Sequence, residues 1–125
     1  MKAIVLQELN RDAEGMDLFD SLVTTDMPYP EPGENEVTVK VMASALNHRD
    51  LWIVRGLYAG IKPPIILGSD GAGVVDKVGS RVDAGLVGSA VIINPSLRFG
   101  DNPRVQGKEF SILGLPEDGT QAEYV

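Results

Sequence analysis

Residues 36–55, EVTVKVMASALNHRDLWIVR, change from one apolar spacing to another near their centre. Valines occur at every second position from Val37, which is the period of a strand with one buried face. Across His48–Arg55 the apolar residues follow helical spacing instead, and Gly56 is a typical helix end. We therefore predict a core strand over Glu36–Ala45, followed directly by one short helix.

The junction between this strand and this helix carries polar residues. Asn47 is a good N-cap residue, and Asp50 can return a hydrogen bond to the Asn47 backbone while its charge favours the positive end of the helix. A cap explains this pattern by itself. The N-terminus of a helix also presents free N–H groups, so polar side chains there can hold a coenzyme amide or a substrate oxygen. Both interpretations stay open at this point.

Short apolar runs on both sides of the junction predict further strands. We expect an opening hairpin from Lys2–Glu8 and Leu18–Thr25, with its turn at Gly15 and the acidic residues between the strands. The run Ile65–Val75 contains three glycines, which inside a strand mark a bend, a bulge or the close approach of another backbone. We predict a bent core strand there.

The last third of the chain is rich in turn residues. Apolar runs at Ala90–Ile93 and Phe110–Leu115 flank a long stretch of loop composition, Ser96–Gly107. The sequence stops within an apolar pattern at Ala122–Val125, so we expect a part of a longer protein. Many short strands with few helices predict a mainly β, barrel-like domain with one or two short helices.

Composition limits the classes of function. A length of 125 residues suits one domain with a hydrophobic core. The net charge of −7, with no run of Lys and Arg, argues against a nucleic-acid partner. The sequence shows no apolar stretch of membrane-spanning length and no signal peptide, so we expect no membrane partner and a cytoplasmic location.

The glycines of the run Ile65–Val75 do not form a dinucleotide fingerprint. That fingerprint needs three glycines spaced G-x-G-x-x-G between a strand and a helix. Gly71 and Gly73 fit the first two places, but the third falls on Asp76, and a strand-like sequence follows. A phosphate cradle is therefore not expected here.

The choice of metal ligands is narrow. The sequence has no cysteine, which excludes disulfides and thiolate zinc sites, and His48 is its one histidine. A catalytic zinc generally takes three protein ligands, and acidic residues alone favour harder ions. We therefore expect no bound zinc. His48 can still act as an acid or a base, because the ordinary pKa of histidine lies near neutrality.

Several segments in order resemble the GroES-like domain of the medium-chain dehydrogenases/reductases. They are Pro32–Val37, then Ala45–Trp52 with Arg55–Tyr58, then Pro64–Gly79, and finally Gly119–Val125. The resemblance covers essentially the whole chain. It implies a GroES-like partly open barrel over residues 1–125, the substrate-side domain, with a C-terminal Rossmann domain that this chain lacks.

The resemblance also identifies a branch of that family. Zinc-dependent members carry a cysteine where this chain has Asn47, and Gly-His-Glu where it has Gly68-Ser69-Asp70. Their structural-zinc lobe corresponds to the region between Asn94 and Gly114, which has no cysteine here. Both metal sites look lost, and the chain is most similar to the zinc-independent, quinone-oxidoreductase-like branch.

Site residues follow from the same resemblance. Asn47, Asp50 and His48 are expected to be catalytic, and Asn47 with Asp50 to contact the coenzyme. Trp52 is expected to line the substrate pocket, with Tyr58 as the next candidate for its wall.

The implied function is that of the whole protein. It would transfer a hydride between NADPH and a small quinone, enone, aldehyde or ketone, with the coenzyme bound mainly by the missing domain. Chemistry of this kind belongs largely to the coenzyme, while the protein orients and stabilises the reacting groups. We expect the 125-residue chain alone to be inactive and the full-length protein to be a homo-oligomer.

Two alternatives remain. A zinc-dependent alcohol dehydrogenase with unusual ligands would draw on His48, Asp50 and Asp70. A non-catalytic β-barrel interaction module, such as a chaperonin cofactor, would need a mobile apolar loop, and Ser96–Gly107 is too polar and charged for that role.

Overall fold

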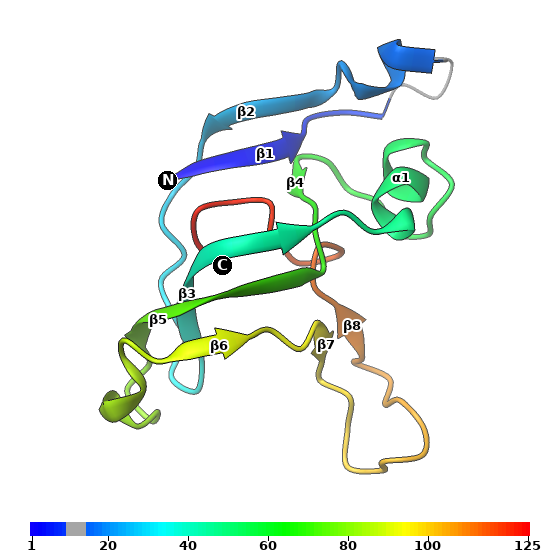
Figure 1. Cartoon of the computed structure of the whole chain (residues 1–125). Helices are drawn as coiled ribbons and strands as arrows, with labels where there is room; N and C mark the ends of the chain where they lie inside the picture. The colour runs from blue at the N-terminus through cyan, green and yellow to red at the C-terminus, as the bar shows by residue number, and fades with distance from the viewer. Residues whose placement is uncertain (10–14) are drawn as a thin grey trace.

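The computed structural model describes residues 1–9 and 15–125 and is mainly β. One sheet has the strand order β2-β1-β4, a second has the order β3-β5-β6, and β7 pairs with β8 (Figure 1). All strand pairs are antiparallel. The strands are β1 (Lys2–Leu6), β2 (Leu22–Asp26), β3 (Val37–Ala45), β4 (Ile65–Ile66), β5 (Asp70–Val78), β6 (Ala90–Ile92), β7 (Ser96–Leu97) and β8 (Ser111–Ile112). The helices are the α-helix α1 (His48–Val54) and the 3-10 helices η1 (Gly15–Phe19) and η2 (Ala84–Leu86).

The C-terminal segment joins the two larger sheets. It bridges β1 through the pair Ala3 and Ala122, and β3 through the pair Lys40 and Tyr124. Figure 1 shows this last segment, in red, between β1 and β3. Backbone hydrogen bonds run from both sides to it, including Ile4 N–H to the Gln121 carbonyl at 2.9 Å. The predicted mainly β, partly open barrel with one or two short helices is thus confirmed, with one α-helix in the described residues.

The chain passes from one sheet to the other at Gly68. The predicted single bent strand is wrong in this detail, because β4 and β5 belong to different sheets. Gly68 has a φ of 98°, and a Cβ added there would lie 2.6 Å from Thr120 Oγ1. Only glycine tolerates this conformation and this contact. The glycine signal was therefore correctly interpreted as a bend, but local sequence does not reveal that the bend separates two sheets.

The opening hairpin is present with a shorter second strand. β1 and β2 pair in register from Lys2 opposite Asp26 to Leu6 opposite Leu22. The predicted start of the second strand at Leu18 is wrong, because Leu18 lies in η1, where its side chain is buried in the core. Of the predicted turn, Gly15 begins η1 and residues 10–14 lie outside the described residues.

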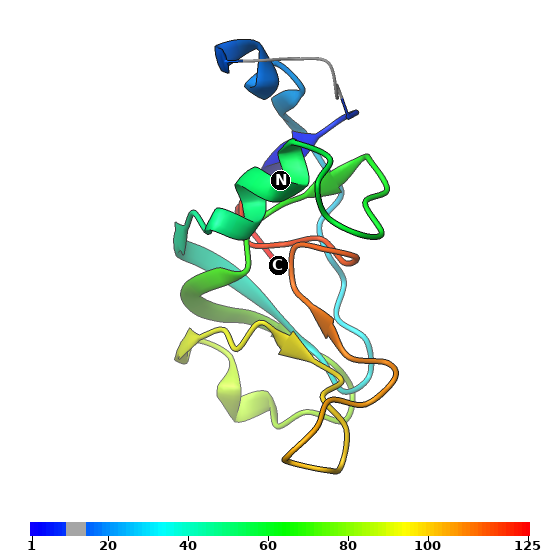
Figure 2. The same cartoon turned by 90° about the vertical axis from the view of Figure 1, so that its right-hand side faces the viewer.

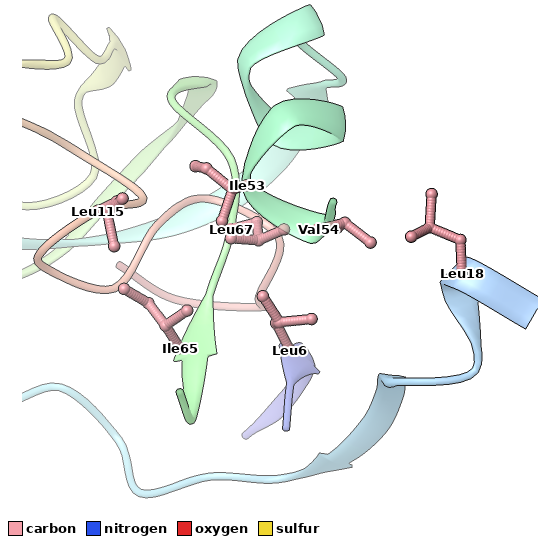
Figure 3. Close-up of a cluster of buried hydrophobic side chains, with 7 residues drawn as sticks. All are labelled: Leu6, Leu18, Ile53, Val54, Ile65, Leu67 and Leu115. Carbon is pink, nitrogen blue, oxygen red and sulfur yellow. The ribbon is translucent and has the colours of Figure 1, made fainter. Parts of the chain in front are cut away.

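Helix α1 is anchored by its apolar face. Ile53 and Val54 are buried against side chains from β1, β4 and the C-terminal third of the chain (Figure 3). The buried cluster consists of Leu6, Leu18, Ile53, Val54, Ile65, Leu67 and Leu115. Each such side chain contributes about 1.5–3 kcal/mol when fully buried. This packing fixes where the first turn of α1 meets the ends of β3 and β5.

The region predicted as a loop projects from the barrel. Figure 2 shows the segment between β7 and β8 at the end of the molecule opposite β1. Its first two residues form β7, so loop structure begins only after Leu97. The rings of Phe99 and Phe110 meet edge to face at 5.7 Å between centroids, and Gly107 N–H donates to the Phe99 carbonyl at 2.7 Å.

No helix within residues 1–9 and 15–125 is long and apolar enough to cross a membrane.

The Tyr29 phenol ties the segment before β3 to β5. Burial raises the pKa of Tyr29 to about 12, and the hydrogen bond from its hydroxyl to Asp76 Oδ2, at 2.7 Å, adds to the rise. Because the pKa of Tyr29 in the folded state lies above the ordinary value of 10.0, the protonated phenol favours the folded state. This contribution is present below pH 10 and is lost as the pH rises toward 12.

Ultraviolet titration should show one tyrosine ionising last, and Asp76→Asn should move that step to lower pH. An unchanged titration of Asp76→Asn would contradict the assignment.

Candidate functional site

The first turn of α1 is built on a buried carboxylate. Asp50 is 5% exposed, and its two oxygens accept hydrogen bonds from two backbone N–H groups: Asn47 at 2.9 Å and Gly68 at 3.2 Å. One bond closes the predicted capping box, and the other ties the helix to the bend between β4 and β5. Asp50 therefore fixes the backbone beneath the site, and its carboxylate is largely shielded from solvent.

The Asn47 side chain takes part in two arrangements. It forms a capping box with Asp50 at the start of α1, without a separate side-chain cap hydrogen bond. Its amide Nδ2 also donates to Asp70 Oδ2 at 2.9 Å. Asp70 is the first residue of β5 and pairs with Ala45, the last residue of β3. The ends of two strands and the start of α1 thus converge on this amide and carboxylate.

His48 and Trp52 lie one turn apart on the outer face of α1. Their rings stack at 5.9 Å between centroids with an angle of 17°, as residues four apart on a helix can do. His48 is exposed and Trp52 is 43% exposed. The helix therefore presents an aromatic surface to solvent next to Asn47, but neither ring forms a hydrogen bond within the described residues.

Two hollows lie near α1, and Tyr58 lines the smaller of them. The Arg49 guanidinium lies 5.0 Å from the centre of the Tyr58 ring, and both residues line a hollow of about 330 Å³ with residues 108–112 and 115–117. A larger groove of about 550 Å³ runs along the end of β3, past the exposed Met42 and Leu46, and stops one residue before Asn47. Of the five predicted site residues, Tyr58 alone lines either of these two hollows.

Arg49 is a residue that the sequence analysis missed. Its guanidinium donates to Ser69 Oγ at 3.0 Å and to the carbonyls of Leu113 and Leu115 at 3.1 and 2.9 Å. Those carbonyls lie 64 and 66 residues further along the chain, so no local spacing indicates them. Arg49 holds the start of α1 against the segment after β8 and thereby supports its neighbour Asn47.

The side chains at this corner do not fit a zinc ion. Among residues 1–9 and 15–125 no group of three or more His, Cys, Asp or Glu side chains lies close enough to hold a metal. Both oxygens of Asp50 are taken by backbone N–H groups, and Asp70 accepts the Asn47 amide. The groups left at the corner are the Asn47 amide, the Asp70 carboxylate and the single imidazole of His48, which fall short of the three protein ligands of a catalytic zinc.

Comparison with known proteins identifies the family of this domain. The sequence model of the alcohol dehydrogenase GroES-like domain matches residues 33–125. A zinc-type alcohol dehydrogenase-like protein of Schizosaccharomyces pombe is 37% identical over 110 residues, covering 85% of this chain and 31% of its own length. A quinone oxidoreductase of Salmonella typhimurium is 39% identical over 71 residues, covering 57% of this chain and 22% of its own.

Solved structures agree with this result. The crystal structure of an NAD-dependent alcohol dehydrogenase superposes on the whole chain with a TM-score of 0.85 at 38% identity, over 36% of its own length. The chain thus spans about a third of the length of such relatives. The family match and the shared fold together place this chain in the alcohol dehydrogenase GroES-like domain family of the medium-chain dehydrogenases/reductases.

Proposed function

We propose that this domain is the substrate-side part of an oxidoreductase that transfers a hydride between a nicotinamide coenzyme and a small quinone, enone, aldehyde or ketone without zinc. The chain contains no dinucleotide fingerprint, so the proposal places the nucleotide-binding domain outside residues 1–125. The coenzyme supplies the hydride chemistry. The residues of this chain orient the reacting groups and offer hydrogen bonds to the developing oxyanion.

The observation that carries the proposal is the position of the Asn47 amide. It lies at the start of α1, partly exposed, with its backbone held by the buried Asp50 and its Nδ2 bound to Asp70. The zinc-dependent proteins that this chain resembles have a cysteine ligand at this place. An amide there supplies N–H and C=O groups in a fixed position, which suits hydrogen bonding to a coenzyme amide or a substrate oxygen.

The other predicted residues take distinct parts in this proposal. Asp50 acts as a positioning residue, because both of its oxygens are occupied by backbone N–H groups. His48 and Trp52 offer a stacked aromatic surface beside the amide, and the Tyr58 ring packs against the Arg49 guanidinium in a separate hollow. The preference for NADPH stays a prediction, and the similar solved structure is named as NAD-dependent.

The zinc-dependent alternative is favoured by the name of the fission-yeast relative. It would need His48, Asp50 and Asp70 to meet at one ion. His48 stacks on Trp52, and Asp50 is buried among backbone N–H donors. These contacts support the zinc-free proposal over its alternative. The family relationship to dehydrogenases likewise favours an enzyme over an interaction module.

One experiment separates the two enzymatic alternatives. The full-length protein is dialysed against a chelator, its zinc content is measured by elemental analysis, and reduction of a simple quinone and a simple aldehyde is followed with NADPH and NADH. We expect turnover at a zinc content well below one ion per chain, since this corner lacks thiolate and paired imidazole ligands. Turnover that disappears on dialysis and returns in proportion to added zinc would instead establish the alcohol dehydrogenase alternative.

A further inference from the structure

A hydrogen bond joins two side chains that are 23 residues apart and lie beside each other on the surface. Asn47 Nδ2 donates to Asp70 Oδ2 at 2.9 Å, while Asp70 is exposed and Asn47 partly exposed. A hydrogen bond between two groups that water also reaches adds little net stability, because it replaces bonds to water. Asp70 takes part in none of the ion pairs found within the described residues. The main effect of the bond is therefore on the direction of the Asn47 amide.

The carboxylate of Asp70 extends from a tightly held backbone. The Asp70 carbonyl accepts a hydrogen bond from Oγ1 of the fully buried Thr120 at 2.8 Å. Asp70 itself pairs with Ala45 across the β3–β5 ladder. The preceding Ser69 is buried, and its hydroxyl donates to the Leu113 carbonyl at 3.0 Å. Few bonds are left to rotate between this anchored backbone and the carboxylate.

A carboxylate restricts the amide it faces. An ionised aspartate only accepts hydrogen bonds, whereas an asparagine side chain has an NH₂ donor end and a carbonyl acceptor end. Turning the Asn47 amide over would place its Oδ1 against the Asp70 carboxylate, and the two oxygens would repel. The amide is therefore held with its NH₂ end toward Asp70 and its Oδ1 on the side of the Asp50 backbone N–H that completes the capping box, so both ends face fixed directions.

We propose that Asp70 is a positioning residue that fixes the orientation of the Asn47 amide and so determines which of its atoms meet the reacting molecule. The inference rests on the proposed function, in which Asn47 contacts coenzyme or substrate. It assigns Asp70 a role that needs a carboxylate, because an amide at position 70 would accept either orientation of Asn47.

The test compares three substitutions in the full-length protein. Asp70→Asn keeps one possible hydrogen bond to Asn47 but permits both amide orientations, so kcat/KM should fall about twofold to fivefold with an unchanged melting temperature. Asp70→Ala removes the anchor, and kcat/KM should fall about tenfold through lost orientation. Asp76→Asn is the matched control: it makes the same change on the same strand, roughly 20 Å away at about 3.3 Å per residue. It should leave kcat/KM unchanged.

A second readout does not depend on turnover. In the isotope-labelled 125-residue chain, the side-chain amide of Asn47 should give one NMR signal pair with a proton shifted by the carboxylate. Asp70→Asn should broaden or double that pair, and Asp76→Asn should leave it as in the wild type. A purely structural role for Asp70 would not produce this pattern.

The outcomes separate the inference from the function on which it rests. If Asn47→Ala leaves turnover at the wild-type level, the proposed function fails. If Asn47→Ala lowers turnover while Asp70→Asn and Asp70→Ala leave both turnover and the Asn47 amide signal unchanged, the positioning role of Asp70 is wrong. If Asp70→Ala fails to fold, Asp70→Asn still decides the question, because it preserves size and a hydrogen-bonding partner.

Discussion

Replacing Asn47 with aspartate is expected to lower the turnover of the full-length protein about a hundredfold, comparable to removing one oxyanion donor. The substitution removes both N–H groups of the amide and places a carboxylate where negative charge develops. It also puts that carboxylate against Asp70, whose Oδ2 now accepts from Asn47 Nδ2 at 2.9 Å. Because this pair is largely exposed, we expect the repulsion to lower the free energy of unfolding by only about 1 kcal/mol. Steady-state reduction of a quinone and thermal unfolding of the same sample measure the two effects.

The double substitution Asn47→Asp with Asp70→Asn separates structure from function. The amide introduced at position 70 can donate to the carboxylate introduced at position 47, so the hydrogen bond forms again in the opposite direction. We expect the melting temperature to return to the wild-type value while turnover stays low. Recovery of both would make Asn47 a structural residue only. An Asn47→Asp single variant with wild-type stability and kinetics would leave it as a helix cap and remove it from the site.

Replacing Gly73 with alanine is expected to remove a large part of the domain's stability. A Cβ at this position would lie 2.1 Å from the Lys40 carbonyl oxygen and 2.8 Å from a methyl group of Val39, in the middle of the β3–β5 pair. The strands would have to move apart, and overpacking of this kind costs about 3 kcal/mol or more. Domains of this size have only about 5–15 kcal/mol of stability in total. Circular dichroism during thermal and urea unfolding measures the loss.

Gly85→Ala provides the matched control for Gly73. Gly85 is exposed in η2, and the nearest atom to an added Cβ is an oxygen of the Asp83 side chain at 3.3 Å. We expect this variant to lie within about 0.5 kcal/mol of the wild type, as is usual for surface substitutions. A Gly73→Ala protein that melts like Gly85→Ala would show that the close approach of β3 and β5 does not limit the choice of residue at position 73.

Local spacing predicted the elements that local forces form. The valines from Val37 onward predicted β3, and the change of period at Asn47 predicted α1 within one residue at its end. Both depend on neighbours two to four positions away, which the sequence displays directly. The glycines of the run Ile65–Val75 predicted a bend, which Gly68 supplies, and Gly73 shows the close backbone approach that was one of the alternatives.

Local spacing failed where a distant partner decides. Leu18 looks like the start of a strand, but its place in the core is in a 3-10 turn, against α1 and β1. Arg49 shows no distinctive pattern, because its acceptors are carbonyls of Leu113 and Leu115. The bond from Gly68 N–H to Asp50 shows no local pattern either, while the catalytic role that the resemblance implies for Asp50 stays a prediction.

The sequence by itself determined the mainly β class, the strand-to-helix junction and the absence of cysteine ligands. Each of these follows from residue types and their spacing alone. Only the tertiary structure decided that β4 and β5 lie in different sheets and that the Asn47 amide also meets Asp70. The physical reason is that a side chain such as Asn47 has several partners of similar strength, and which one it meets depends on strands brought together by burial of the core.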